Sequence, residues 1–185
     1  PQWLVVDESF MDFLQYDSRY TVRDLTTEYP HLFVVQSLTK FYALPGLRLG
    51  FGVASPEVVA RLESGKDVWN VNTLAQRAGV AALSDLDYQQ ASRQQLIGAS
   101  QQLYAGLMRI AGVRPLQPSV NFILIDIRNT GYTSTALTAL LRTRGILIRD
   151  CANYPGLDGQ SFVRVAVRCP AENEQLLKAL EAVIK

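Results

Sequence analysis

Two short apolar runs, each ending in polar residues, constrain the fold of this chain more than any other sequence feature. Residues 4–6 lead into Asp7, and residues 32–35 lead into Gln36 and Ser37. Short apolar runs that are rich in β-branched residues and end in polar ones are typical of central strands in a parallel sheet. Ligands of such sheets bind at the carboxyl ends of the strands. The sequence therefore predicts an α/β fold with a buried strand at residues 3–6, and with Asp7 and Ser37 at one ligand-binding edge.

Further strands and helices follow along the chain. The predicted strands span residues 48–54, 122–127, 146–149 and 162–167, and the predicted helices span 56–66, 73–83, 87–110, 135–144 and a terminal stretch from about Ala171. Ser55 and Pro56 are typical of a helix start. The segment 112–118, which contains glycine and proline, interrupts the helical pattern. We predict a first domain at residues 1–86 and a small C-terminal domain with its own sheet at residues 87–185.

Charge and cysteine content exclude several functional classes. The 185 residues carry a formal net charge of +1, so there is no general electrostatic attraction to nucleic acid or to an anionic membrane. No apolar run reaches the ~20 residues of a membrane span. Two cysteines do not make a disulfide framework, and no cysteine or histidine cluster suggests a metal site. A His-based triad would have to use His31, the only histidine, and no neighbouring residue supports that role. We therefore expect a cytoplasmic protein without a metal, and without a nucleic-acid or membrane partner.

The segment from Ser37 to Gly50, together with Asp7, contains the groups of a cofactor site. Ser37 supplies a hydroxyl, Lys40 an amine and Arg48 a guanidinium. A pyridoxal-phosphate (PLP) enzyme needs a lysine that condenses with the cofactor aldehyde, a carboxylate at the ring nitrogen, and hydroxyl and cationic donors for the phosphate. Ser37 and Lys40 are three residues apart, so a helical turn would project both from one side. The Pro45-Gly46 turn can bring Arg48 back toward them.

Each of these residues also has a simpler interpretation. A single lysine is usually a solvated surface residue, Asp7 and Ser37 can act as caps, and Arg48 can form a surface ion pair. Ser37 and Lys40 also fit the Ser-x-x-Lys pattern of acyl-transfer enzymes, but the Ser-Asp-Asn and Lys-Thr-Gly elements of that class are absent. A non-catalytic domain is a further alternative. The combination of groups, in this order at strand ends, favours the PLP site.

The stretch Asp7-Glu8-Ser9-Phe10, followed by the segment from Ser37 to Gly50, resembles the class I/II aminotransferases. The resemblance covers essentially the whole chain. It implies an aspartate-aminotransferase-like α/β fold (PLP fold type I), with residues 1–86 in the C-terminal part of the large PLP-binding domain. It also implies a homodimer in which Lys40 forms a Schiff base with PLP and Asp7 pairs with the ring nitrogen, while Ser37 and Arg48 bind the cofactor phosphate.

The C-terminal half of the chain indicates the substrate. Residues 146–157 and 162–168 are similar to the branch of the family that decarboxylates L-threonine O-3-phosphate in cobalamin biosynthesis. The resemblance implies that Arg164 holds the substrate α-carboxylate, that Arg149 and Asn153 lie near this phosphorylated amino acid, and that Asn121 borders the site. A histidinol-phosphate aminotransferase is the alternative. From the residues alone, Arg164 and Arg168 fall on the polar face of an alternating strand, which suits an acidic ligand and a solvated face equally well.

Two departures from the family pattern limit these expectations. Aminotransferases commonly have Tyr three residues after the Asp, whereas this chain has Phe10, which lacks the hydroxyl. Pro1 is not an initiator Met, and the first predicted strand begins at residue three. We therefore expect the natural chain to extend upstream, with the Gly-rich phosphate turn and the ring-stacking aromatic there. This part of the chain is expected to be inactive by itself.

Overall fold

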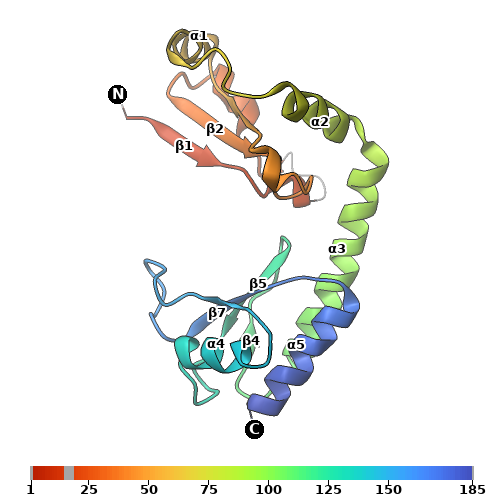
Figure 1. The fold of residues 1–185 in the computed structure, drawn as a ribbon. Coiled ribbons are helices and arrows are strands. Elements are labelled where there is room, and N and C mark those ends of the chain that lie inside the picture. The colour runs from red at the N-terminus through yellow and green to blue at the C-terminus, as the bar shows by residue number, and fades with distance from the viewer. Residues whose placement is uncertain (1, 15–18, 185) are drawn as a thin grey trace. The chain divides into compact units, whose positions relative to one another are not determined.

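The computed structural model of the chain describes residues 2–14 and 19–184. The chain divides into two compact units, Pro1–Gln90 and Ala91–Lys185 (Figure 1). The domain boundary predicted between residues 86 and 87 falls at the start of helix α3 (Leu86–Leu107), which runs through the change of unit. Among the described residues, no helix is both long enough and apolar enough to cross a bilayer.

A three-stranded sheet forms the centre of the first unit. Its strands are β1 (Leu4–Asp7), β2 (Leu32–Ser37) and β3 (Gly50–Val53), in the order β1-β2-β3. Strands β1 and β2 are parallel, which confirms the prediction from their apolar runs. Strand β3 is antiparallel to β2 and shorter than predicted. The carboxyl ends of β1 and β2 therefore lie at the same edge of the sheet, where β3 begins.

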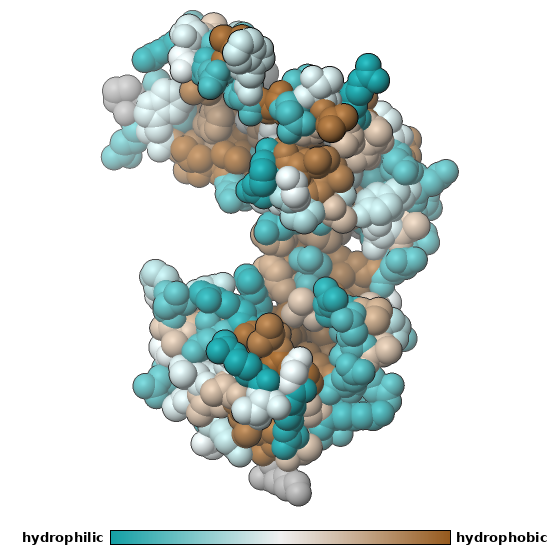
Figure 2. Space-filling model, viewed as in Figure 1, coloured by the Kyte–Doolittle hydropathy of each residue, from teal (hydrophilic) through white to brown (hydrophobic). Residues whose placement is uncertain are grey.

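Strand β1 is more exposed than predicted. The side chains of Leu4 and Val5 are each 61% exposed, so the expectation of a buried strand at residues 3–6 is wrong. The physical reason is that β1 lies at the edge of the described sheet and pairs with β2 alone. Strand β2 lies between two neighbours, and every second residue along it is buried. The first unit also exposes other apolar side chains, as Figure 2 shows.

Helices and 3-10 turns make up the other regular structure described in the first unit. The 3-10 turns are η1 (Met11–Phe13), η3 (Arg23–Thr27) and η4 (Pro45–Leu47), and the helices are α1 (Pro56–Gly65) and α2 (Thr73–Ser84). Helix α1 has Ser55 at its N-cap and Pro56 in its first turn, as predicted, although the Ser55 hydroxyl makes no capping hydrogen bond. Helix α2 is capped by Asn72, whose side chain accepts a hydrogen bond of 2.9 Å from the amide of Ala75.

An antiparallel sheet of four strands forms the second unit. Its strands are β4 (Arg114–Pro115), β5 (Phe122–Asp126), β6 (Arg149–Asp150) and β7 (Phe162–Ala166), in the order β4-β5-β7-β6. Helices α4 (Ser134–Arg142) and α5 (Pro170–Val183) and the C-terminal part of α3 contribute buried side chains to its apolar core. The core is one continuous cluster that includes Leu103, Ile123, Leu137, Val165 and Leu180.

The predicted strand at residues 146–149 is largely wrong. Only Arg149 and Asp150 pair with β7. Ile146 and Ile148 pack against the apolar core from a loop, whereas Leu147 between them is 76% exposed. Burial therefore alternates along these three apolar residues as it would in a strand, but core packing produces the alternation without a ladder of hydrogen bonds.

Candidate cofactor and substrate site

The first four predicted site residues all belong to the first unit, at or just beyond the carboxyl edge of its parallel strands. Asp7 is the last residue of β1 and lies opposite Val35 in the register. Ser37 is the last residue of β2, two positions further on. Because side chains alternate along a strand, Asp7, Val35 and Ser37 share one face of the sheet. The structure therefore brings the predicted carboxylate and the predicted hydroxyl to the same face and edge.

The Asp7 carboxylate is held in an ionised form by its own turn. The backbone amide of Ser9 donates a hydrogen bond of 2.8 Å to Asp7 Oδ1. Hydrogen bonds from the Ser9 side chain and amide lower the pKa of Asp7 below its ordinary value of 3.8, against a small opposing effect of burial. A carboxylate that stays charged at neutral pH is suited to pair with a protonated ring nitrogen.

Lys40 projects from a tightly packed turn that follows β2. Its neighbours Leu38 and Phe41 are each 3% exposed and belong to a small apolar cluster, whereas Lys40 itself is exposed. The Tyr88 hydroxyl donates a hydrogen bond of 2.9 Å to the carbonyl of Phe41. Lys40 Nζ lies 5.8 Å from the centroid of the Phe10 ring, three residues beyond Asp7. The turn thus directs the Lys40 amine toward the segment that follows the Asp7 strand.

Arg48 returns to the same edge through the antiparallel pairing of β2 with β3. Ser37 lies opposite Gly50, and the amide of Leu38 donates to the carbonyl of Leu49 at 3.2 Å. Arg48 follows η4 and adopts the left-handed conformation, with φ of 53°. Its guanidinium is exposed and donates to the carbonyl of Pro45 at 2.8 Å. The strand pairing therefore brings the backbone next to Arg48 back beside the end of β2, while the Arg48 guanidinium itself contacts Pro45.

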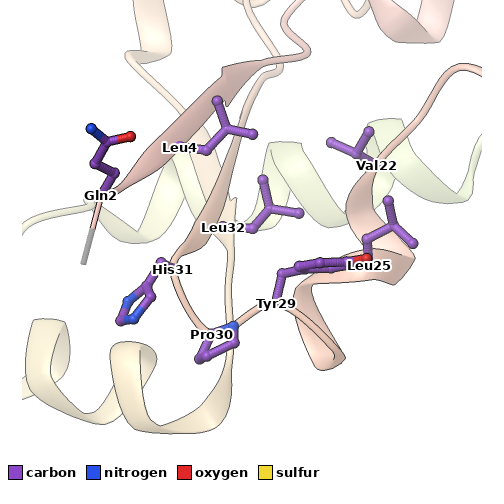
Figure 3. A pocket seen from close by; sticks show the side chains of 8 residues that line it. All are labelled: Gln2, Leu4, Val22, Leu25, Tyr29, Pro30, His31 and Leu32. Atoms are coloured by element: carbon purple, nitrogen blue, oxygen red, sulfur yellow. The ribbon is translucent and has the colours of Figure 1, made fainter.

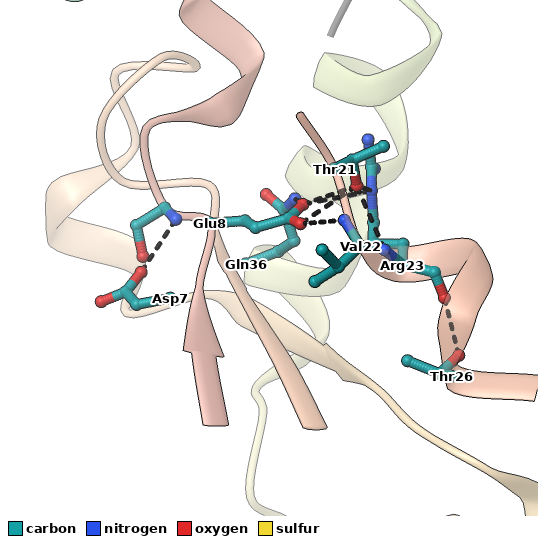
Figure 4. Close-up of polar contacts among 8 residues, drawn as sticks. Asp7, Glu8, Thr21, Val22, Arg23, Thr26 and Gln36 are labelled. Carbon is teal, nitrogen blue, oxygen red and sulfur yellow. Dashed lines mark hydrogen bonds and ion pairs between the residues drawn. The ribbon is translucent and has the colours of Figure 1, made fainter. Parts of the chain in front are cut away.

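Glu8, next to Asp7, is a buried residue that the sequence pattern did not reveal. It is 2% exposed and points to the opposite side of the sheet from Asp7 (Figure 4). Its carboxylate accepts hydrogen bonds from the Thr21 hydroxyl, the Val22 amide and the Gln36 side chain. No sequence signal pointed to it, because Glu is normally a surface residue and its partners are distant in sequence.

The three predicted substrate residues belong to the second unit. Arg149 on β6 and Arg164 on β7 are direct partners in the antiparallel register. Arg149 Nη2 donates a hydrogen bond of 2.7 Å to Asn153 Oδ1. The guanidinium carbons lie over aromatic rings, that of Arg149 at 5.2 Å from the Tyr154 centroid and that of Arg164 at 4.6 Å from the Phe122 centroid. Within residues 2–14 and 19–184, neither arginine forms an ion pair with a carboxylate.

Asp150 holds this arginine segment against helix α4. The hydroxyls of Ser134 and Thr135 donate to its two oxygens, each at 2.7 Å, and the amide of Ala152 donates at 2.9 Å. Although burial acts in the opposite direction, these hydrogen bonds lower the pKa of Asp150. No local sequence signal pointed to this residue, because its role depends on partners 15 and 16 positions away.

Asn121 and Arg168 complete the polar groups near β7. Asn121 Oδ1 is buried and has no hydrogen-bond partner among the described residues, while its backbone carbonyl accepts from the amide of Val167. Arg168 pairs with Glu172 at 2.9 Å. Arg168 is therefore engaged just before α5, whereas Arg164, within β7, forms no ion pair among the described residues.

A pocket of about 390 Å³ lies elsewhere in the first unit (Figure 3). It is bordered by parts of β1, β2 and η3, and it contains none of the predicted site residues. Its lining residues are Gln2, Leu4, Val22, Leu25, Tyr29, Pro30, His31 and Leu32. The lining is mostly apolar and carries no carboxylate or amine side chain, so it offers no groups for the chemistry considered above.

The donor set at the edge of the first sheet fits PLP. An ionised carboxylate, an exposed amine, a hydroxyl and an exposed guanidinium come from Asp7, Lys40, Ser37 and Arg48. The Thr39 hydroxyl lies 2.8 Å from the Ser37 hydroxyl and adds a second oxygen donor beside the place proposed for the phosphate. These groups match the aldehyde, ring nitrogen and phosphate of the cofactor in kind.

Comparison with known proteins finds matches in a family of PLP enzymes. The family model described as aminotransferase class I and II matches residues 2–183. Threonine-phosphate decarboxylase of Salmonella typhimurium is 39% identical over 182 residues, which are 98% of this chain and 48% of that protein. The chain spans about half the length of the curated relatives that it matches.

Solved structures show the same relationship. The histidinol-phosphate aminotransferase of Clostridium acetobutylicum matches with a TM-score of 0.90 at 30% identity, over 98% of this chain and 54% of that one. The histidinol-phosphate aminotransferase of Sinorhizobium meliloti, solved in complex with pyridoxal-5'-phosphate, matches with a TM-score of 0.85 at 24% identity, over 99% of this chain and 49% of that one.

Proposed function

Because the chain belongs to the aminotransferase class I and II family, whose members use PLP, we propose that the full-length protein decarboxylates L-threonine O-3-phosphate. The product would be (R)-1-aminopropan-2-yl phosphate, in cobalamin biosynthesis. The fold is the aspartate-aminotransferase-like PLP fold of type I. The identity of 39% to a threonine-phosphate decarboxylase supports the reaction, and because this chain spans about half of that relative, the activity belongs to the full-length protein.

The pairing of Arg149 with Arg164 is the observation that carries the proposed substrate. Like charges directly opposite each other on antiparallel strands are destabilising. An anionic ligand removes this repulsion and gains charge-assisted hydrogen bonds from both guanidinium groups. L-threonine O-3-phosphate has two anionic groups, a carboxylate and a phosphate. We propose that Arg164 holds the carboxylate and that Arg149, oriented by Asn153, contacts the phosphate.

We propose that Lys40 bonds to the cofactor, that Asp7 pairs with its ring nitrogen, and that Ser37 and Arg48 hold its phosphate. When bound, PLP supplies an electron sink for the electron pair released when a bond at the substrate Cα breaks. Asp7 keeps a proton on the ring nitrogen because its own pKa is low. Arg164 orients the substrate carboxylate. The amine of Lys40 would be the group that returns a proton to the substrate Cα.

An aminotransferase acting on histidinol phosphate is the second candidate, and the TM-score of 0.90 to such an enzyme favours it. The ring of Phe10 argues against it. Phe10 stacks on Phe13 with centroids 6.0 Å apart, and it has no hydroxyl to offer the oxygen on the cofactor ring.

One assay of the full-length protein separates the two reactions. The protein is incubated with PLP and L-threonine O-3-phosphate, with and without a keto acid. We expect release of carbon dioxide without a keto acid, whereas turnover that requires the keto acid would support the aminotransferase. Lys40→Ala should abolish turnover. Borohydride reduction followed by peptide mapping should place the cofactor on Lys40, and its appearance on Lys66 or Lys178 would contradict the assignment.

The oligomeric state and the cellular location of the protein are further proposals. We propose that the full-length protein is a cytoplasmic homodimer, as the family resemblance and the small number of cysteines suggest. Sedimentation equilibrium of the full-length protein at micromolar concentration tests the assembly. A mass of two chains is expected, and a monomer with full activity would contradict it.

A further inference from the structure

We propose that Glu8 and Gln36 form a positioning pair, which sets the separation between Asp7 and Ser37 and thereby controls how PLP is held. The inference rests on the proposed roles of Asp7 and Ser37. Neither Glu8 nor Gln36 is placed in contact with cofactor or substrate. Each is adjacent in sequence to a proposed cofactor residue, and the hydrogen bond between them is 3.1 Å long.

The Glu8–Gln36 pair and the Asp7–Ser37 pair lie on opposite faces of the same sheet. In β2, Val34 and Gln36 are buried, whereas Val35 and Ser37 are only partly buried. The amide of Glu8 donates to the carbonyl of Val35 at 2.8 Å, which continues the parallel register one residue beyond β1. Glu8 and Gln36 therefore share the buried face, and Asp7 and Ser37 share the other one.

Glu8 is held by groups from two directions. Its Oε1 accepts from the Val22 amide at 2.7 Å, and its Oε2 accepts from the Thr21 hydroxyl at 2.8 Å and from Gln36 Nε2 at 3.1 Å. Arg23 Nε lies 3.4 Å from Oε2. Figure 4 shows these contacts converging on the Glu8 carboxylate from the segment 21–23 and from β2, on the side away from Asp7. The carboxylate thus ties the end of β1 both to the neighbouring strand and to the loop.

This network has little freedom to move. A buried carboxylate is stable only while its hydrogen-bond partners stay in place. Removal of the Glu8 carboxylate would leave the Val22 amide and the Gln36 side-chain amide without their acceptor. A shift of β1 relative to β2 would break the Glu8–Gln36 hydrogen bond and would move Asp7 relative to Ser37. Because one cofactor molecule has to meet both residues, its binding depends on that separation.

The test uses the full-length protein with Glu8→Ala and with Gln36→Met, which keeps the side-chain size but removes the amide. We expect each variant to raise the PLP dissociation constant about tenfold, comparable to the loss of one buried hydrogen bond. We also expect the pH midpoint of the cofactor's visible absorbance band to move by about half a unit or more, because Asp7 no longer meets the ring nitrogen correctly. Glu8→Gln should recover part of the affinity, because its amide oxygen still accepts from Val22.

Thr26→Val is the matched control. The buried Thr26 hydroxyl donates to the carbonyl of Arg23 in the same part of the fold, at 2.7 Å, so its loss removes a comparable hydrogen bond without touching Glu8. Its PLP affinity and pH midpoint should match the unaltered protein. If Gln36→Met folds and keeps both readouts unchanged, or if Thr26→Val shifts them equally, the positioning role is wrong. Failure of the unaltered protein to bind PLP would instead reject the proposed function.

Discussion

Buried neighbours decide where the functional side chains of this protein point. Lys40 is exposed because Leu38 and Phe41, on either side of it in the turn, are held in an apolar cluster. Asp7 is exposed because Glu8, the next residue, is anchored on the opposite face of the sheet. In each case a residue without a chemical role restrains the backbone, and the reactive group is left free to meet a ligand.

Replacement of Ser9 should change the titration of Asp7. Hydrogen bonds from Ser9 hold the pKa of Asp7 below 3.8 in the folded protein. This contribution to stability is complete above that value and is lost as the pH falls through the lowered pKa. In Ser9→Ala the side-chain hydrogen bond disappears while the amide remains, so the pKa should rise part of the way to 3.8. Carbon NMR of labelled Asp7 measures the change, and an unchanged or lower pKa would contradict the assignment.

Replacement of one arginine in the Arg149–Arg164 pair should change the stability of the ligand-free protein and its stabilisation by ligand in opposite directions. Arg149→Gln removes the repulsion of Arg164, so the ligand-free protein should be more stable by roughly a few tenths of a kcal/mol. The same change should weaken stabilisation by L-threonine O-3-phosphate, which thermal melts with and without the ligand can measure. Arg142→Gln, in helix α4, is a control for loss of one positive charge. Equal ligand stabilisation in Arg149→Gln and the unaltered protein would count against an anion at this pair.

At the scale of elements, the ends of helices differ in how well they are capped. Asn72 and Thr133 accept hydrogen bonds from the first turns of α2 and α4. Ser55 occupies the equivalent place in α1, but its buried hydroxyl has no partner among the described residues. Residues of similar type at similar positions therefore contribute differently to stability, and sequence alone does not distinguish them.

Two substitutions test this difference in capping. Asn72→Ala should lower the free energy of unfolding by about 1 kcal/mol, because the Ala75 amide loses its acceptor. Ser55→Ala should leave the free energy unchanged or slightly raise it, because it removes a buried hydroxyl that lacks a partner. Urea denaturation of both variants measures the difference. The opposite order of stability would show that the Ser55 hydroxyl is the one that caps its helix.

Helix α3 is linked to the turn that carries Lys40 by the hydrogen bond from Tyr88 to the carbonyl of Phe41. Tyr88→Phe removes this bond but keeps the ring contact with Phe41, whose centroid lies 6.1 Å away. We expect a loss of about 0.5–1.5 kcal/mol in the free energy of unfolding. Amide exchange of the Lys40 turn should also accelerate. Unchanged exchange there would mean that the apolar cluster alone holds the turn.

At the scale of the whole molecule, the two units have cores of different size. The second unit has a continuous cluster of 15 buried apolar residues, whereas the cluster beneath the Lys40 turn has three. Stability is therefore expected to be unevenly distributed, with the proposed cofactor residues in the less well-packed unit. A ligand that bridges several of these residues would add most of its stabilisation there.

Hydrogen exchange can test this distribution. In residues 1–185 by themselves, amides of β5 and β7, which lie in the larger core, should exchange much more slowly than those of β1. Leu137→Ala, at a fully buried position, should lower the free energy of unfolding by about 2–5 kcal/mol and speed exchange in β5 and β7. Slower exchange in β1 than in β5 would contradict the expected difference between the cores.

Local sequence was enough to predict the strand ends that carry Asp7 and Ser37, most of the helices, and the kinds of group that a PLP site requires. These depend on the period of apolar residues and on turn residues, which act over a few positions. The same local pattern misplaced the strand at residues 146–149 and predicted burial for β1.

Tertiary structure alone decided the burial of Glu8, its contact with Gln36 28 residues away, and the register that places Arg149 opposite Arg164. The physical reason is that burial and register are set by contacts between distant segments. The free energy of such a contact depends on both segments and cannot be predicted from either one alone.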